Sequence, residues 1–269
     1  MPRAWCLIRS QPHYRREAFE AGLRAAGYEV KCEDLHVARI DMKAVRPDDR
    51  LVLWNRYGTG EVLGAQFERA GGQVIVAENG YLGDDSQGRQ HYAIALGHHN
   101  GGGRWYVGGP ERWRGLGVEL KPWREDGQHI LVCPQRGIGP KGYAQPTGWA
   151  EQVVSKVRAS TRRPLRVRPH PGNVPQAEAR ASLARDLEGC WAMVTWASGA
   201  GIHALVAGVP VYYDAPRWIL GNAGDKGVAL LDTPTYAERW PAFEQMAWAQ
   251  WTVGEIASGE PFKRLQELS

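Results

Sequence analysis

The sequence predicts a soluble α/β protein of two domains. Its 269 residues suffice for one large domain or for two of ordinary size. Strand-like apolar runs alternate with helical patterns, and this rhythm occurs twice along the chain. A glycine-rich stretch over residues 79–127 separates the two occurrences. Hydrophobic residues make up 43% of the chain and charged residues 23%, which is typical of globular proteins.

The first half predicts a parallel sheet covered on both faces. Phe19 and Leu23 recur on one face of a helical segment that Gly27 ends. Because helices alternate with strands, neighbouring strands run in the same direction. The expected strands are Ala4–Ile8, Tyr28–Cys32, Arg50–Asn55 and Gln73–Ala77, and the expected helices are Tyr14–Ala26 and Thr59–Ala70.

Residues 79–127 predict long loops with short elements, because glycines are frequent and periodicity is weak. The tyrosines and tryptophans in this stretch argue against disorder. A second strand–helix rhythm begins at Gln128. The expected strands are His129–Cys133, Leu165–Val167, Trp191–Thr195 and Val209–Tyr213, and the expected helices are Thr147–Ser160, Pro175–Leu187 and Gly199–Ala207.

These patterns predict two Rossmann-like domains, residues 1–125 and 126–240, followed by a helical segment, residues 241–269. Trp248 and Trp251 lie three positions apart, so we expect them to pack into the core from one helix face. The four cysteines lack metal-ligand or redox spacing and predict reduced, buried thiols.

Charge and hydropathy restrict the possible partners only mildly. A net charge of +4 permits a polyanionic or phosphorylated ligand but does not require one. No apolar run approaches the ~20 residues of a membrane span. Met1–Ile8 is too short in its apolar part for a signal peptide, so we expect a cytoplasmic protein without a membrane partner.

Two strand ends in the second half carry groups suited to phosphate. Arg136 follows the strand 129–133, and its forked guanidinium matches phosphate oxygens, while Gly137 lets the backbone approach a ligand. His170 stands between two prolines after the strand 165–167, where its ring N–H can donate to phosphate. Taken singly, each segment is also compatible with a plain structural turn.

The third strand end is the turn Thr195–Gly201, which leads into a helix. Ser198 is suited to cap that helix, and the helix N-terminus favours anions. An ordinary capped helix is the alternative. Because ligands bind at the carboxyl ends of strands in such sheets, we expect all three ends to form one nucleotide-phosphate site. Its residues are Arg136, Gly137, His170, Ser198, Gly199, Ala200 and Gly201.

Other motifs exclude several enzyme classes. The sequence has no Walker A motif, no His-Glu-x-x-His motif and no Gly-x-Ser-x-Gly elbow. His98-His99 lacks a partner at metal-ligand spacing, and Asp84-Asp85, although suited to a cation, is more typical of a polar turn, so no metal site is predicted.

The Arg168–Pro171 turn together with Ser198–Tyr213 resembles the donor domain of GT-B glycosyltransferases. That family pairs two Rossmann-like domains across a cleft, with the nucleotide sugar on the C-terminal domain and the acceptor on the N-terminal one. Its last helix crosses back to the first domain. The Arg-Pro-His-Pro turn is also similar to that of capsule-polysaccharide transferases of the same fold.

This resemblance implies a nucleotide-sugar co-substrate, expected to be a UDP-sugar, with no other cofactor and no catalytic metal. Asp214, at its strand end, is expected to hold hydroxyls of the donor sugar. Many GT-B enzymes carry a ribose-binding glutamate where this chain has His203. That departure leaves the identity of the nucleotide open.

A second set of motifs is similar to phage proteins that glycosylate 5-hydroxymethyl-pyrimidines in DNA. The motifs are Glu78–Tyr81, His99–Gly101, Gln135–Gly137 and Ala249–Thr252 with Glu255-Ile256. This resemblance implies a double-stranded DNA acceptor. The attacking hydroxyl needs a general base, for which Glu78 is the first candidate because it follows a strand, with Asp84 and His98 in reserve.

Three alternatives remain at this point. The acceptor could be a polysaccharide or a lipid-linked sugar. The chain could be a non-catalytic nucleotide- or DNA-binding protein, which His203 in place of glutamate favours. It could also be an epimerase that acts on a nucleotide sugar without an acceptor. The sugar, the stereochemical outcome and the oligomeric state are left open by the sequence.

Overall fold

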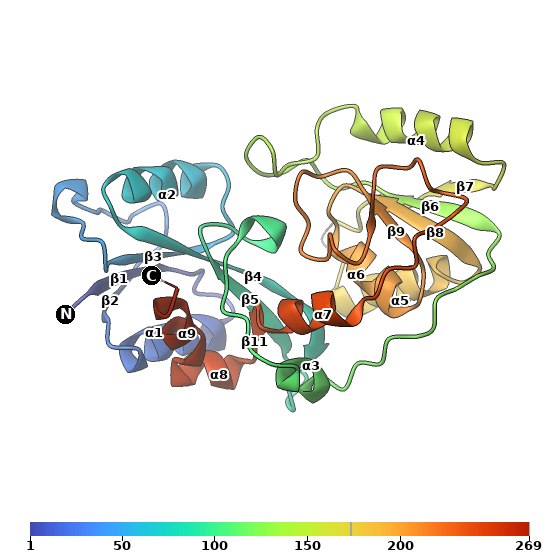
Figure 1. Ribbon diagram of the computed structural model, residues 1–269. Helices are drawn as coiled ribbons and strands as arrows, with labels where there is room; N and C mark the ends of the chain where they lie inside the picture. The colour runs from blue at the N-terminus through green and yellow to red at the C-terminus, as the bar shows by residue number, and fades with distance from the viewer. Residues whose placement is uncertain (173, 269) are drawn as a thin grey trace. The chain divides into compact units, whose positions relative to one another are not determined.

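The computed structural model describes residues 1–172 and 174–268 (Figure 1). The chain forms two compact units, each with its own sheet. Unit 1 consists of Met1–Leu116 and Glu244–Ser269, and unit 2 of Gly117–Phe243. The first segment of unit 1 ends at Leu116, whereas the sequence predicts a domain boundary at residue 125.

Unit 1 contains a mixed six-stranded sheet in the order β11-β5-β4-β3-β1-β2. Strands β1 to β4 are parallel, as predicted, whereas β5 and β11 run antiparallel to their neighbours. The expectation of a purely parallel sheet is therefore wrong for this unit. The strands are β1 (Arg3–Leu7), β2 (Glu29–Cys32), β3 (Arg50–Trp54), β4 (Gln73–Asp84), β5 (Gln90–Leu96) and β11 (Gln250–Trp251).

Strand β4 continues well past the predicted end at Ala77 and forms a hairpin with β5, so the expectation of loops is wrong here. The register shifts between Asn79 and Asp84, which marks a bulge. At Gly80 an added Cβ would lie 2.6 Å from the His91 carbonyl oxygen. Close strand packing therefore requires a glycine at this position. From the sequence alone, a glycine of this kind cannot be distinguished from a loop glycine.

Helices cover both faces of the first sheet (Figure 1). α1 (His13–Ala25), α8 (Val253–Ser258) and α9 (Glu260–Gln266) lie on one face, and α2 (Thr59–Arg69) lies on the other. α1 and α8 approach so closely that a Cβ at Gly22 would meet the Ile256 carbonyl. Short elements complete the unit: α3 (Glu111–Gly115) and two 3-10 turns, Met42–Ala44 and Asn100–Gly102.

The C-terminal segment is not one helix. α7 (Trp240–Ala247) precedes β11, and a capping box between Thr252 and Glu255 then begins α8. Trp248 follows α7 and Trp251 lies in β11, so the expectation of one shared helix face is wrong. Their rings pack edge to face with centroids 6.1 Å apart, and both are buried in the unit 1 core, which confirms their core role.

Unit 2 contains a five-stranded sheet in the order β10-β9-β8-β6-β7, and all neighbouring strands are parallel. The predicted strand–helix alternation is confirmed, with β10 as an addition. The strands are β6 (His129–Cys133), β7 (Leu165–Val167), β8 (Cys190–Thr195), β9 (Val211–Tyr213) and β10 (Asp225–Lys226), and the helices are α4 (Trp149–Ser160), α5 (Gln176–Asp186) and α6 (Gly199–Val206).

Each sheet has a point at which the strand order reverses. In unit 2 the chain moves from β6 to β7 on one side and returns to β8 on the other. In unit 1 the same reversal separates β1 from β3. Ligands of open α/β sheets bind beside the carboxyl ends of strands at such points. Within residues 1–172 and 174–268, no helix has the length and apolarity to cross a membrane.

Candidate functional site

The carboxyl ends of β6 and β8 are tied together by side chains. The Gln135 Oε1 accepts a hydrogen bond from the Ala197 N–H at 3.0 Å. The Thr195 hydroxyl donates to the Cys133 carbonyl at 3.0 Å and accepts from the Ser198 N–H at 3.2 Å. These bonds hold the two turns side by side at the switch point. The two strand ends therefore converge, as the sequence predicts.

Arg136 adds a positive charge to this edge of the sheet, and His170 adds a ring nitrogen. Both side chains are exposed, and no described residue forms an ion pair with Arg136. Partial burial and then the Arg136 charge lower the pKa of His170. The His170 Nδ1 accepts the Gly172 N–H at 3.0 Å, which leaves Nε2 as the donor of the neutral ring. Gly137 adopts a left-handed φ of 68°.

The turn at the start of α6 offers fewer free donors than expected. The Ser198 hydroxyl caps the helix by accepting the Ala200 N–H at 3.2 Å, and the Ser198 carbonyl accepts the Gly201 N–H at 3.1 Å. With the Ser198 N–H also bonded inside the turn, Gly199 is the exposed position. Gly201 is a packing residue, because a Cβ there would lie 2.8 Å from the Trp218 ring.

Asp214 and His203 flank the same edge. One Asp214 carboxylate oxygen accepts the Trp149 indole N–H at 2.7 Å, so this carboxylate is held in a fixed position at the end of β9. Trp149 packs edge to face on Trp196, with centroids 6.0 Å apart. Burial, with a smaller contribution from the Arg180 charge, lowers the pKa of His203 to about 4. The His203 ring is therefore neutral at pH 7.

Glu78 lies inside β4 and does not follow its end, which corrects the sequence-based placement. It nevertheless stands level with the end of β3, because the Asn55 N–H donates to the Ala77 carbonyl at 2.9 Å. The Glu78 carboxylate accepts the Asn79 N–H at 2.9 Å. Burial and the nearby Glu78 charge raise the pKa of Tyr81. Glu78 is thus at the carboxyl edge of the parallel strands.

The second base candidate, His98, is buried directly after β5. Its ring stacks on His99 with centroids 4.5 Å apart. Burial, followed by the charge of Arg56, lowers the pKa of His98. Burial and His98 lower the pKa of His99 to about 4. Both rings are therefore neutral near pH 7.

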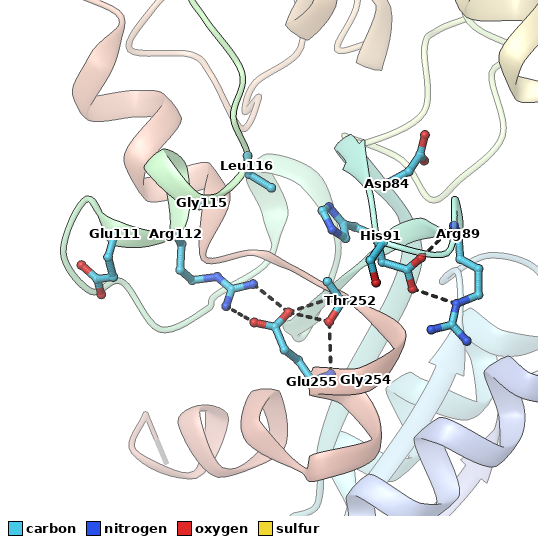
Figure 2. Close-up of a pocket in the computed structure, with 12 residues that line it drawn as sticks. Asp84, Arg89, His91, Glu111, Arg112, Gly115, Leu116, Thr252, Gly254 and Glu255 are labelled. Carbon is cyan, nitrogen blue, oxygen red and sulfur yellow. Dashed lines mark hydrogen bonds and ion pairs between the residues drawn. The ribbon is translucent and has the colours of Figure 1, made fainter.

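Asp84, the third candidate, is the exposed last residue of β4 and lines a cavity of about 550 Å³ (Figure 2). Six residue steps separate it from Glu78, which corresponds to roughly 20 Å along an extended strand. Glu78 and Asp84 therefore do not belong to one site. The cavity also holds an internal ion pair, because Arg112 donates to Glu255 at 2.7 and 3.3 Å (Figure 2).

The motif Ala249–Thr252 with Glu255 has a structural role. Gln250 is 1% exposed, and its Oε1 accepts the N–H groups of Tyr81 and Leu82 at 2.7 and 3.0 Å. It thereby pairs backbone groups that the β4 bulge leaves without strand partners. The Arg112 guanidinium lies 3.9 Å from the Trp251 ring centroid and clamps the segment to α3.

A cavity of about 700 Å³ lies at the carboxyl ends of β1, β2 and β3, and we name it the β1–β3 cavity. The sequence did not lead us to expect it. It lies at the switch point of unit 1. Applying the strand-end rule to the first half of the sequence would have found its residues. Its polar and aromatic lining comprises Arg9, Ser10, Gln11, Asp34, His36, Trp54, Asn55, Tyr57 and Thr59. In the described part of the chain, no cluster of three or more His, Cys, Asp or Glu side chains suits a metal ion.

Comparison with known proteins identifies the fold. No protein-family model matches the chain, and no curated protein matches it. Among solved structures, the KpsC β-Kdo 2,7 transferase of Thermosulfurimonas dismutans matches with a TM-score of 0.58 and 14% identity over 99% of this chain and 100% of that chain. The KpsC β-Kdo 2,4 transferase of the same organism has a TM-score of 0.57 and 14% identity, over 92% of this chain and 89% of that one. The chain shares the fold of these glycosyltransferases.

Proposed function

We propose that the protein is a glycosyltransferase that moves a sugar from a nucleotide sugar to a hydroxyl acceptor. The observation that carries this proposal is the pair of turns tied by Gln135 at the switch point of the parallel sheet, with Arg136 and His170 beside them. The fold shared with two Kdo transferases supports it.

In this proposal the carboxyl edge of unit 2 holds the donor, a UDP-sugar. Arg136 and the His170 Nε2–H contact the diphosphate, together with the Gly199 N–H at the start of α6. The Asp214 oxygen that faces away from Trp149 accepts hydroxyls of the sugar. His203, a neutral ring, stands where related enzymes hold ribose with a carboxylate.

The proposal includes the GT-B arrangement, with the acceptor on residues 1–125, the donor on residues 126–240, and residues 241–269 packing back on the acceptor domain. Glu78 removes the proton of the attacking hydroxyl, with His98 and Asp84 as less favoured bases. The C–O bond to the diphosphate breaks as the new glycosidic bond forms. Arg136 and His170 stabilise the charge that grows on the leaving diphosphate. No metal or further cofactor takes part.

The preferred acceptor is a 5-hydroxymethyl-pyrimidine in phage DNA, on the strength of the motifs shared with such proteins. The second candidate is a capsule-type glycan acceptor, which the fold shared with KpsC favours. A non-catalytic nucleotide- or DNA-binding protein is the alternative of another class, and turnover of the donor excludes it.

The test is mass spectrometry of nucleosides from 5-hydroxymethylcytosine DNA after incubation with the protein and a panel of nucleotide sugars. A mass gain of one hexose or pentose supports the reaction, the acceptor and the donor together. If no gain occurs but thermal shift shows donor binding, the glycan acceptor is favoured. Absence of both favours the non-catalytic alternative.

A further inference from the structure

We propose that the β1–β3 cavity binds one nucleotide of the acceptor strand, with the phosphate on Arg9 and Arg15 and the base against Trp54 and Tyr57. This inference rests on the proposed function, because it names the place and the chemistry of acceptor binding. It follows from unsatisfied groups around the cavity and from its aromatic wall.

The first unsatisfied group is a buried cation. Arg15 of α1 is 7% exposed, and its guanidinium lies 4.1 Å from the Trp54 ring centroid. It donates to the Gln11 carbonyl, but its Nε has no hydrogen-bond partner. The ion pairs formed within residues 1–172 and 174–268 include neither Arg15 nor Arg9. A buried cation without a carboxylate is costly, and an anionic ligand would supply the missing charge.

Arg9 strengthens this requirement. It is exposed at the rim of the cavity, and its charge is near enough to add to the lowering of the Arg15 pKa, which burial mainly causes. Two neighbouring cations repel each other unless an anion lies between them. Asp34 is the one acidic residue of the lining, and it is already paired with Arg16 at 3.1 Å.

The second unsatisfied group is an amide. Asn55 directly follows β3 in the left-handed region with φ of 60°, and its Oδ1 is buried without a hydrogen-bond partner. Such backbone strain clusters at ligand sites. A buried acceptor needs a donor, and the exocyclic amino group of a cytosine-type base offers one.

The aromatic wall fits a base. Trp54 lines the cavity, and the Arg15 guanidinium reaches the same wall, because it packs on the Trp54 ring and donates to the carbonyl of the lining residue Gln11. Tyr57 is 41% exposed, so its ring is available for stacking. Enzymes that modify a base extrude it into a pocket of this kind, with aromatic side chains against its faces. A volume of about 700 Å³ accommodates a nucleotide. A neutral glycan would leave Arg15 uncompensated, so a phosphate-bearing ring fits the observed groups better.

The experiment measures fluorescence anisotropy of a labelled single-stranded oligonucleotide that contains 5-hydroxymethylcytosine, with the full chain and its variants. Arg9→Ala should raise Kd about tenfold, since it removes a charged hydrogen bond. It should also reduce the slope of log Kd against log salt by about one. Arg69→Ala is the matched control, because it removes the same charge from the exposed end of α2, away from the cavity. It should change neither quantity.

The stacking contact has its own variant pair. Tyr57→Ala should weaken binding by roughly fivefold or more, whereas Tyr57→Phe keeps the ring and the affinity. Equal effects of Arg9→Ala and Arg69→Ala would overturn the inference. Binding of an acidic glycan that depends on Arg9, with no binding of the oligonucleotide, would overturn it in favour of a polysaccharide.

The same preparations separate this inference from the proposed function. If the wild type binds DNA through Arg9 but neither transfers nor hydrolyses any nucleotide sugar, the enzyme proposal fails and the nucleotide site stands. If sugar transfer occurs and Arg9→Ala leaves the KM for DNA unchanged, the nucleotide site fails and the enzyme proposal stands.

Discussion

The carboxyl edges of the two sheets differ in how their strand ends are held. In unit 2, Gln135 and Thr195 link neighbouring turns through hydrogen bonds, and Trp149 holds Asp214. In unit 1, Arg15 and Asn55 keep buried polar atoms without hydrogen-bond partners beside a cavity of about 700 Å³. The turns of the first edge are preorganised, whereas the buried atoms of the second are those that the proposed nucleotide would contact.

Arginines occur in two environments, and each unit contains both: Arg239 of unit 2 is buried against Trp123, and Arg56 of unit 1 pairs with Glu61 and Glu68. In unit 2, Arg168 pairs with Asp186, and Arg163 pairs with Asp232 while stacking on Trp191. In unit 1, the Arg15 guanidinium faces the aromatic rings of Trp54 and Tyr92. In the proposed function, unit 2 binds the donor and unit 1 binds the acceptor.

The largest expected effect concerns the proposed general base in unit 1. Glu78→Gln should lower kcat by about a hundredfold or more, because a general base contributes 10²–10⁴-fold. Donor affinity, which we assign to unit 2, should stay unchanged by thermal shift. Asp84→Asn is the matched control, since Asp84 lies at the far end of the same strand. Near-normal turnover in Glu78→Gln would remove this residue as the base.

The second effect concerns the stability of unit 1. Arg112→Ala should lower the free energy of unfolding by about 2–3 kcal/mol. The substitution leaves a half-buried Glu255 without its ion pair and removes a cation from the face of the Trp251 ring. Burial tends to raise the Glu255 pKa, but hydrogen bonds from Arg112 and Thr252 keep it below its usual range. Denaturant unfolding measures the loss. Lys31→Ala, which breaks an exposed pair with Glu33, should cost under about 1 kcal/mol.

The third effect tests the donor edge of unit 2. Arg136→Ala should weaken binding of a UDP-sugar about tenfold, since it removes one charged hydrogen bond to phosphate. Isothermal titration measures the affinity. Arg162→Ala, an exposed arginine at the opposite end of β7, serves as the control. Equal losses in both variants would indicate a general charge effect and would contradict the assignment.

The smallest effect is a pH dependence of stability in unit 1. The pKa of His99 is lowered to about 4, so below pH 6.5 the unfolded chain binds a proton that the folded chain does not. The contribution of neutral His99 to the free energy of unfolding is therefore present above pH 6.5 and is lost as the pH falls toward 4. His99→Gln should flatten thermal stability over this window. An unchanged pH profile in that variant would show that His99 does not govern it.

Local patterns were sufficient for much of the fold. The parallel strands β1 to β4 and β6 to β9 follow from apolar runs that alternate with helical periodicity, because each element buries its own apolar face. Arg136, His170 and Ser198 were predicted as site residues by the strand-end rule, which needs only the order of elements. The same rule would have found Asn55 and Tyr57 in the first half of the chain.

Only the tertiary structure decided which distant segments complete unit 1. β5 pairs with the extended part of β4, and β11 pairs with β5. The Gln250 side chain of β11 accepts the Leu82 N–H at the β4 bulge, although the two residues are 168 positions apart in the sequence. No local periodicity encodes such a contact. The sequence by itself determined the two α/β halves, because each strand and helix buries its own apolar face. Tertiary packing decided that Glu78 and Asp84 stand apart, that Trp248 and Trp251 meet outside a helix, and that Arg15 is buried without a carboxylate, since each depends on contacts between segments far apart in the chain.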